Sequence, residues 1–228
     1  MPAKVNGLKI ERKFTDAGKD PFQKLDWKKR DVEIRNFDGT VAFSMDNVNL
    51  PDNYSQVAAN VLAQKYLRKA GIPKKLRKVK ESDVPSWLQK SVPDAKALES
   101  LPESERTGEE IDGKQTFRRL AGTWTYWGWK HGYFASERAA RSYYDEMCYM
   151  LAFQMVSPNS PQWFNTGLNW AYGIEGPAQG HYFVNPENGD LEKSINAYEH
   201  PQPHACFIQS VSDLSLIHIS EPTRRTPI

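Results

Sequence analysis

The chain has 228 residues, of which 39% are hydrophobic and 25% are charged, so it is long enough for one large domain or two small ones with a globular core. Its 30 lysines and arginines nearly balance 28 acidic residues, and the formal net charge of +2 predicts no general attraction to nucleic acid or to an anionic membrane. Two cysteines exclude a secreted disulfide framework, and without a signal-peptide core or a membrane-length apolar run we expect a cytoplasmic protein.

The first part of the chain, residues 1–114, is expected to hold a hairpin, a helix and a connecting segment. Apolar and charged residues alternate over Asp31–Met45 on both sides of the turn-forming sequence Phe37–Thr40, which predicts a β-hairpin. The preceding Lys29–Asp31 is faintly similar to a nucleotide-binding cone motif, but the glycine that should follow is absent. We therefore interpret this segment as a structural hairpin.

A helix is predicted to start at Asn53 or Ser55 and to end near Lys69, because Gly-Ile-Pro at residues 71–73 breaks it. Residues 65–80 carry eight lysines and arginines and no acid. Since this run lacks interleaved aromatic residues for base stacking, we favour a solvated helix end over a nucleic-acid contact. The side chains expected on the buried face of the helix are Val57, Val61, Leu62 and Tyr66.

Residues 81–114 are rich in charge, serine and proline, and they predict a long surface connection with at most a short helix near Trp87. This segment is the best candidate for a boundary. Five of the seven tryptophans then fall between Trp124 and Trp170, so the second region, residues 115–213, is expected to carry the denser core.

Two long helices are predicted in this second region, over Thr116–Trp129 and over Ser136–Val156, the latter with Ser136 as its N-cap. Cys148 lies inside the second helix and is interpreted as a small core residue rather than a reactive thiol. The residues expected on the buried faces are Phe117, Leu120, Ala121, Trp124 and Trp127 in the first helix, and Tyr143, Met147, Met150, Leu151 and Gln154 in the second.

The segment Ser157–Gly167 contains two prolines three residues apart, which predict a rigid turn. Pro161 suits the first turn of a short helix that ends at Gly167. The turn would display the Ser160 hydroxyl and backbone N–H groups, where an anionic or hydroxylated ligand is readily held. An ordinary capping serine explains the same spacing, and the spacing alone does not decide between the two.

The glycine-rich loop Gly173–Gly180 lacks the order of a phosphate-binding motif. A second hairpin is predicted from His181–Val184 and Leu191–Ile195, which flank the turn-forming pair Asn188–Gly189. The apolar segment Ala205–Val211 follows two prolines and is predicted to be a buried strand.

Cys206, near the start of this predicted strand, has three interpretations. The first is a zinc site that it would form with His200 and His204, with His181 as a further ligand, although the spacing is not a familiar ligand pattern. The second is a plain core residue beside surface histidines. The third is a redox or nucleophilic thiol whose thiolate is favoured by His204.

Three ordered segments narrow these alternatives: Gly122–Trp129, Asn159–Gly167 and Pro203–Ile208. Together with Leu50-Pro51 and the helix after it, they closely resemble the adenosylcobalamin-dependent, class II ribonucleotide reductases over roughly residues 8–213. Three ordered blocks of this length are far more specific than any single motif.

The resemblance implies a ten-stranded α/β barrel preceded by a helical region. The present chain is then expected to be an α+β fragment, mainly α with short hairpins, that includes the first barrel strand. The implied enzyme is an adenosylcobalamin-dependent ribonucleoside-diphosphate reductase, which makes 2′-deoxyribonucleotides by a cobalamin-initiated thiyl radical mechanism. The residues present leave the choice between diphosphate and triphosphate substrates open.

The resemblance also implies site residues and partners. Cys206 matches the first cysteine of the redox-active pair, while Ser160, Ala205 and Cys206 match positions that hold the ribose and phosphate of the ribonucleotide substrate. The radical cysteine, the second redox cysteine and the cobalamin contacts are not found in this chain. The implied partners are a dithiol reductant such as thioredoxin or glutaredoxin, nucleotide allosteric effectors and a second copy in a homodimer, with no nucleic acid and no membrane.

Residues 214–228 do not resemble the family and are similar to translated sequencing-adapter sequence. We interpret them as a non-family tail and the chain as an N-terminal fragment. The fragment alone is expected to lack reductase activity, and to aggregate because a lone barrel strand leaves unpaired edges. The alternative from another class is a non-catalytic zinc- or nucleotide-binding helical module.

Overall fold

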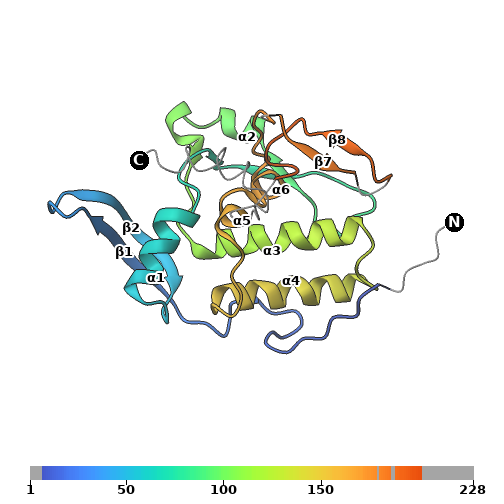
Figure 1. The fold of residues 1–228 in the computed structure, drawn as a ribbon, viewed down its shortest axis with the longest axis horizontal. Coiled ribbons are helices and arrows are strands. Elements are labelled where there is room, and N and C mark those ends of the chain that lie inside the picture. The colour runs from blue at the N-terminus through green and yellow to red at the C-terminus, as the bar shows by residue number, and fades with distance from the viewer. Residues whose placement is uncertain (1–6, 179, 186–187, 202–228) are drawn as a thin grey trace, which may run out of the picture.

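Two long helices side by side, α3 (Gly113–Lys130) and α4 (Glu137–Ala152), form the centre of the molecule (Figure 1). The computed structural model describes residues 7–178, 180–185 and 188–201. Small two-stranded antiparallel sheets and short helices surround the helix pair. Within the described residues the architecture is mixed α/β with small sheets, as the sequence predicts, while the predicted strand Ala205–Val211 lies outside them. No helix of the described residues is long and apolar enough to cross a membrane.

Helix α3 is the predicted first long helix, three residues longer at its start. Asp112 and Gln115 form a capping box. The Asp112 carboxylate accepts from the backbone N–H of Gln115, and the Gln115 side chain accepts from the backbone N–H of Asp112. The predicted face is confirmed at Phe117, Leu120 and Ala121, each 0% exposed. Polar residues on the other faces of α3 are buried as well, because neighbouring elements surround the helix: Thr116, Arg119, Thr123 and Thr125.

Helix α4 begins where predicted, since the Ser136 side chain accepts from the Ala139 N–H. The prediction that it continues to Val156 is wrong: the helix ends at Ala152, and Gln154 adopts a φ of 60°. Gln154 is exposed rather than buried. The predicted face is confirmed at Leu151, which is 1% exposed, and the buried face otherwise runs through Ala140, Tyr144 and Cys148, so Cys148 is the core residue that the sequence predicts.

The first hairpin is longer than predicted. Strands β1 (Trp27–Arg35) and β2 (Val41–Pro51) pair antiparallel from Trp27 opposite Pro51 to Arg35 opposite Val41, with two register shifts. Val32, Val48 and Leu50 are buried against the core, which includes Phe117 of α3. The hairpin therefore packs its inner face on the helix pair while its tip extends from the body of the molecule (Figure 1).

The predicted helix after this hairpin is shorter and partly of another type. Ser55 caps α1 (Gln56–Val61), which passes directly into the π-helix η1 (Leu62–Tyr66), so the predicted end at Lys69 is three residues too late. The predicted buried face is confirmed at Leu62, whereas Val57 is 73% exposed. A π-helix turns less per residue, and the periodicity of an α-helix fails across such a junction.

The connection that follows is more structured than predicted. Strands β3 (Ile72–Pro73) and β6 (Thr107–Gly108) form one small sheet, and β4 (Leu76–Lys78) and β5 (Ser91–Pro93) form another. The segment near Trp87, for which the sequence predicts at most a short helix, is a turn in which the Leu88 N–H donates to the Pro85 carbonyl. The short helices lie later, in α2 (Ala95–Glu99) and the 3-10 turn η2 (Glu103–Glu105).

The C-terminal part of the described chain covers one side of α3. Helices α5 (Ser160–Asn165) and α6 (Leu168–Tyr172) meet at Gly167, and the predicted hairpin is present as β7 (Tyr182–Val184) and β8 (Leu191–Lys193). Its Asn188-Gly189 turn is confirmed by a Gly189 φ of 81° and by a bond from the Asn185 N–H to the Asp190 carbonyl.

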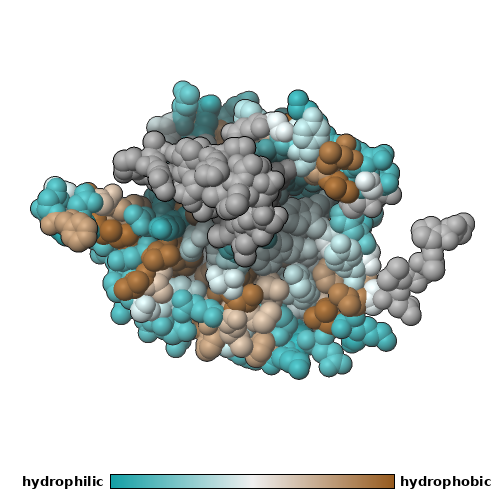
Figure 2. All heavy atoms as spheres, viewed as in Figure 1, coloured by the Kyte–Doolittle hydropathy of each residue, from teal (hydrophilic) through white to brown (hydrophobic). Residues whose placement is uncertain are grey.

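Exposed apolar side chains gather where α1, the end of α4 and α5 meet. The residues are Val57, Val61, Phe153, Met155, Val156 and Phe164, each more than a third exposed. Figure 2 shows apolar surface over this part of the molecule. A patch of this kind marks an interaction surface or a site of aggregation. It is consistent with the expected aggregation of the isolated chain, which stays a prediction.

Candidate functional site

Ser160, the predicted substrate contact within the described residues, is the first residue of α5. The preceding Asn159 is the N-cap and Pro161 follows in the first turn, so Ser160 is not the capping serine that the sequence also allowed. Its hydroxyl lies 3.2 Å from the hydroxyl oxygen of Tyr66, and either group can donate in this hydrogen bond. The Ser160 hydroxyl is therefore held by a side chain rather than used to cap its own helix.

Tyr66 is itself fixed by two features. It is the last residue of the π-helix η1, a rare element that is frequent at functional sites. Its ring stacks on Trp163, with centroids 5.1 Å apart and an interplanar angle of 20°, and lies 5.8 Å from the ring of Phe164. The Trp163 indole N–H in turn donates to the Pro158 carbonyl at 3.1 Å. The contacts of Tyr66 join the π-helix to α5, and the Trp163 bond to Pro158 fixes the chain just before Ser160.

A buried arginine, Arg119 of α3, connects the ends of these two elements. Its guanidinium donates to the carbonyls of Trp163 and Thr166, both at 2.8 Å, and to the carbonyl of Tyr66 at 3.1 Å. The carbonyls at a helix C-terminus lack intrahelical partners, and a cation there is favourable. A single side chain, that of Arg119, therefore provides hydrogen bonds to backbone carbonyls at the C-terminal ends of both α5 and η1.

Glu110 neutralises Arg119, and both side chains are almost completely buried, at 0% and 1% exposed. The carboxylate accepts from the Arg119 Nε at 2.8 Å, from the Arg68 N–H at 2.8 Å and from the Tyr172 hydroxyl at 2.7 Å. Burial raises the pKa of Glu110, but the Arg119 charge and these hydrogen bonds outweigh it and leave the pKa below its ordinary value. The same burial and the charge of Glu110 raise the pKa of Tyr172. The pair is thus ionised and fully hydrogen-bonded, which a buried ion pair requires.

Gly167 lets α5 and α6 approach α3 closely. Its φ is 86°, and a Cβ at this position would lie 2.4 Å from the Arg119 carbonyl oxygen. Helix α5 is therefore fastened to α3 at its C-terminal end, by the guanidinium of Arg119 and by the backbone contact at Gly167.

A small cavity of about 250 Å³ lies next to this turn. Pockets that hold drug-sized ligands range from about 300 to 1,000 Å³. The cavity is lined by Tyr54, Ala58, Val61, Leu62, Tyr66, Leu151, Gln154, Val156, Ser157 and Trp163. It has room for part of a ligand beside Ser160 and not for a large one.

The other predicted site residues fall in different places. Ala205, Cys206 and His204 lie outside the described residues. His200 stacks on Phe183 with ring centroids 3.9 Å apart, and burial lowers its pKa. Within the part of the chain that the structure describes, no group of three or more histidines, cysteines and acids is placed to hold a metal ion. Burial raises the pKa of Cys148 and keeps its thiol protonated, as expected for a core residue.

Sequence reasoning missed the residues that hold the Ser160 turn. Tyr66 was expected only as one member of a buried helix face, and Glu110 and Arg119 were not singled out. A usable signal was present for Arg119, because it lies between Phe117 and Ala121 on a helix that is predicted to be buried. A charged residue in such a position requires a partner of opposite sign.

A comparison with protein-family models matches residues 28–154, more than half of the chain, to the class II vitamin B12-dependent ribonucleotide reductases. The chain belongs to this family. The resemblance expected from the three sequence segments is therefore confirmed, and the family is one that depends on vitamin B12.

Curated relatives agree with this assignment. The vitamin B12-dependent ribonucleotide reductases of Bradyrhizobium diazoefficiens and Agrobacterium fabrum are 60% and 59% identical over 206 residues. That of Rhodopirellula baltica is 31% identical over 208 residues. The match to the first two covers 90% of this chain and 16% of each relative, so the reductase-family chain described here spans about a sixth of their length. A match of 206 residues in a chain of 228 includes Ser160 wherever it starts.

Proposed function

We propose that this chain is the N-terminal part of a cobalamin-dependent reductase that converts ribonucleotides to 2′-deoxyribonucleotides. The support is the high identity to named reductases across 90% of the chain. In this proposal Cys206 is one of two redox cysteines, and Ser160, Ala205 and Cys206 contact the substrate. The proposal also includes one feature of the fold, namely that residues 205–211 form the first strand of a catalytic barrel.

The reduction balances with one thiol pair. Two cysteine thiols give up two electrons and two protons and become a disulfide, while the ribose loses its 2′-hydroxyl as water and gains hydrogen at that carbon. An external dithiol then reduces the disulfide by exchange. Cys148 does not serve as the second thiol, because it is 0% exposed and its pKa is raised by burial.

Ser160 has a positioning task in this proposal. A hydroxyl that is held within 3.2 Å of Tyr66, on a helix that Arg119 fixes to α3, has little freedom left to lose when substrate binds. Catalysis on a single sugar carbon depends on such fixed placement, since small displacements of the reacting atoms slow the reaction strongly. The rigid Ser160 turn is the structural observation that supports a substrate contact here.

The residues around Ser160 do not fit the cofactor itself. Their cavity of about 250 Å³ is smaller than the pockets that hold drug-sized molecules, and a corrin macrocycle is larger than such molecules. We therefore assign cobalamin to none of the residues that line this cavity and derive no step through it.

A chimeric enzyme tests the proposal. Residues 7–213 of this chain would replace the matching segment of the Bradyrhizobium diazoefficiens relative, and deoxyribonucleotide formation would be measured with adenosylcobalamin and a dithiol. We expect activity in the chimera, loss of dithiol-dependent turnover in Cys206→Ser, and retention of activity in the matched control Cys148→Ala. Full turnover in Cys206→Ser would contradict the proposed redox role.

The isolated chain supplies the complementary test. We expect it to form no deoxyribonucleotide under the same conditions, because the second redox cysteine is absent from it. Turnover by the purified chain would show this expectation to be wrong. Stoichiometric zinc that is lost in Cys206→Ser would instead support the alternative, a non-catalytic zinc-binding module.

A further inference from the structure

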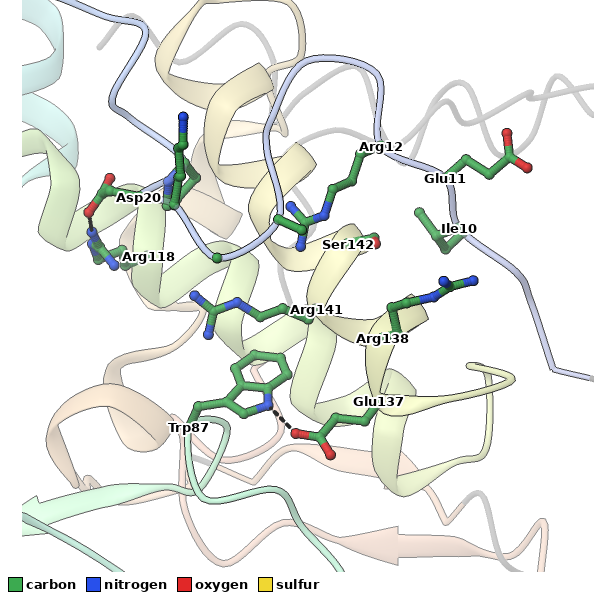
Figure 3. A pocket seen from close by; sticks show the side chains of 14 residues that line it. Ile10, Glu11, Arg12, Asp20, Trp87, Arg118, Glu137, Arg138, Arg141 and Ser142 are labelled. Atoms are coloured by element: carbon green, nitrogen blue, oxygen red, sulfur yellow. Dashed lines mark hydrogen bonds and ion pairs between the residues drawn. The ribbon is translucent and has the colours of Figure 1, made fainter.

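A second, larger cleft lies away from Ser160, between the N-terminal segment, the first turns of α4 and the loop that carries Trp87 (Figure 3). Its volume is about 910 Å³, within the range of small-molecule sites. It shares no lining residue with the cavity beside Ser160. The cationic side chains that line it are Arg12, Lys19, Arg118, Arg138 and Arg141, and the acidic ones are Glu11, Asp20 and Glu137.

Two of these arginines share a single carboxylate. The side chain of Asp145 is 1% exposed and lies 2.7 Å from the Arg12 guanidinium and 3.2 Å from the Arg141 Nε. One negative charge cannot neutralise two guanidinium groups. Asp145 alone therefore leaves one of these two guanidinium charges uncompensated.

The remaining cations are weakly compensated. Arg118 bonds to Asp20 at 2.5 Å, but the side chains of this pair are 39% and 51% exposed, so solvent screens their attraction. Within the described residues, Lys19 and Arg138 make no salt bridge. Of the other acids, Glu137 accepts from the Trp87 indole N–H at 2.9 Å, and Figure 3 shows Glu11 directed away from Arg141.

Arg141 is held in place before any ligand arrives. Its guanidinium carbon lies 4.8 Å from the centre of the Trp87 ring and 5.3 Å from that of Tyr144. Stacking on aromatic rings orders a guanidinium while its N–H groups stay available. Figure 3 shows Arg141 in the middle of the cleft, between Arg12 and Trp87.

We propose that this cleft binds the phosphate groups of a small phosphorylated molecule. Guanidinium groups match phosphate oxygens with paired hydrogen bonds, and arginines from three separate elements, Arg12, Arg118 and Arg141, line this cleft. Phosphate oxygens would take up the charge that Asp145 leaves uncompensated and would replace the exposed Asp20 as the partner of Arg118. The shared chemistry is a run of phosphates, which inorganic polyphosphate and a nucleoside triphosphate both carry.

A purely structural role makes a different prediction. The same ion pairs fasten the N-terminal segment to α4, and if that were their whole purpose, the cleft would have no affinity for phosphates. Two observations therefore decide between the roles: whether phosphates bind, and whether binding depends on Lys19 and Arg138, which make no salt bridge within the described residues.

Titration calorimetry of the chain with inorganic tripolyphosphate and with ATP provides the test. We expect both probes to bind, with affinity that falls as salt rises, and Arg141→Gln to weaken tripolyphosphate roughly tenfold or more. This variant leaves Asp145 paired with Arg12, so the fold is expected to persist. The matched control, Arg35→Gln on β1, removes an exposed arginine outside the cleft and is expected to leave binding unchanged.

Lys19→Gln and Arg138→Gln keep the test decisive if Arg141→Gln fails to fold, because neither side chain makes a salt bridge within the described residues. Each is expected to weaken tripolyphosphate several-fold. Tighter binding of ATP than of tripolyphosphate would identify a nucleotide as the ligand, and equal binding would identify the phosphates alone. No binding of either probe at millimolar concentration, or equal affinity in all cleft variants and the control, would overturn the proposal.

Discussion

Two ion-paired groups, one around Arg119 and one around Arg12 and Arg141, differ in how much of the arginine charge is used. Arg119 is 1% exposed and directs its guanidinium to one carboxylate and three backbone carbonyls. In the cleft, Arg141 is 39% exposed and shares the Asp145 carboxylate with Arg12. The first group fixes the Ser160 turn and has nothing left for a ligand. The second fixes the N-terminal segment and retains positive charge at the surface.

The largest expected effect on the free energy of unfolding follows from removing Arg119 from its buried ion pair with Glu110. Arg119→Met removes the partner of Glu110 and of the carbonyls of Tyr66, Trp163 and Thr166. Removal of one member of a buried ion pair costs about 3–5 kcal/mol, because the other charge stays buried without compensation. We expect the free energy of unfolding, measured with urea, to fall by that amount.

The matched control is Arg35→Met on β1. Arg35 is paired with Glu33, and the two side chains are 56% and 45% exposed. Exposed pairs contribute about 0–1 kcal/mol, so this variant should unfold close to the wild type. Equal losses in Arg119→Met and Arg35→Met would remove the distinction between the two groups.

The N-terminal segment gives an intermediate case. Glu146 of α4 accepts from the backbone N–H groups of Lys13, Phe14 and Thr15 and from the Thr15 hydroxyl. Glu146→Gln places an amide against these donors, and leaving them without a good acceptor should cost about 1–3 kcal/mol. Limited proteolysis should then cut the N-terminal segment faster, while equal rates in both proteins would show that the segment is held elsewhere.

The same carboxylate predicts a pH dependence. Burial raises the pKa of Glu146, but the hydrogen bonds from Thr15, Lys13 and Phe14 outweigh it and lower the pKa below its ordinary value. Because the pKa is lower in the folded state, the ionised carboxylate stabilises the fold fully at pH values above the unfolded-state pKa of about 4.3. This contribution to the unfolding free energy is lost as the pH falls through the folded-state pKa. The difference in unfolding free energy between wild type and Glu146→Gln should be constant near neutral pH and shrink below about pH 4.3. A difference that grows on acidification would contradict this sign.

Several elements could be predicted from sequence because their signals are local. The N-cap at Ser136, the hairpin turn at Asn188-Gly189 and the burial of Cys148 each depend on a few neighbouring residues. The family was equally readable, since three ordered motifs were present. The role of Ser160 as a substrate contact stays a prediction, and so does that of Cys206.

What could not be predicted depends on contacts between distant parts of the chain. Tyr66 meets Ser160 across 94 positions, and Arg119 meets Thr166 across 47. The π-helix that ends at Tyr66 also departs from the α-helical periodicity on which the buried face was predicted, and Val57, in the α-helical part before it, is exposed. No pattern within a single element carries this information.

The smallest expected effect on stability concerns Tyr66, where the partner of Ser160 is a neutral hydroxyl. Tyr66→Phe keeps the ring that stacks on Trp163 and removes only the hydrogen bond to Ser160, so the unfolding free energy should fall by about 0.5–1.5 kcal/mol. If Ser160 contacts substrate as proposed, the chimeric reductase should show a raised KM with kcat less affected, and Ser160→Ala should show the same pattern. Tyr133→Phe, which removes a hydroxyl from a residue that is 61% exposed, is the matched control. An unchanged KM in Tyr66→Phe together with a raised KM in Ser160→Ala would leave Ser160 as a substrate contact and show that Tyr66 does not position it.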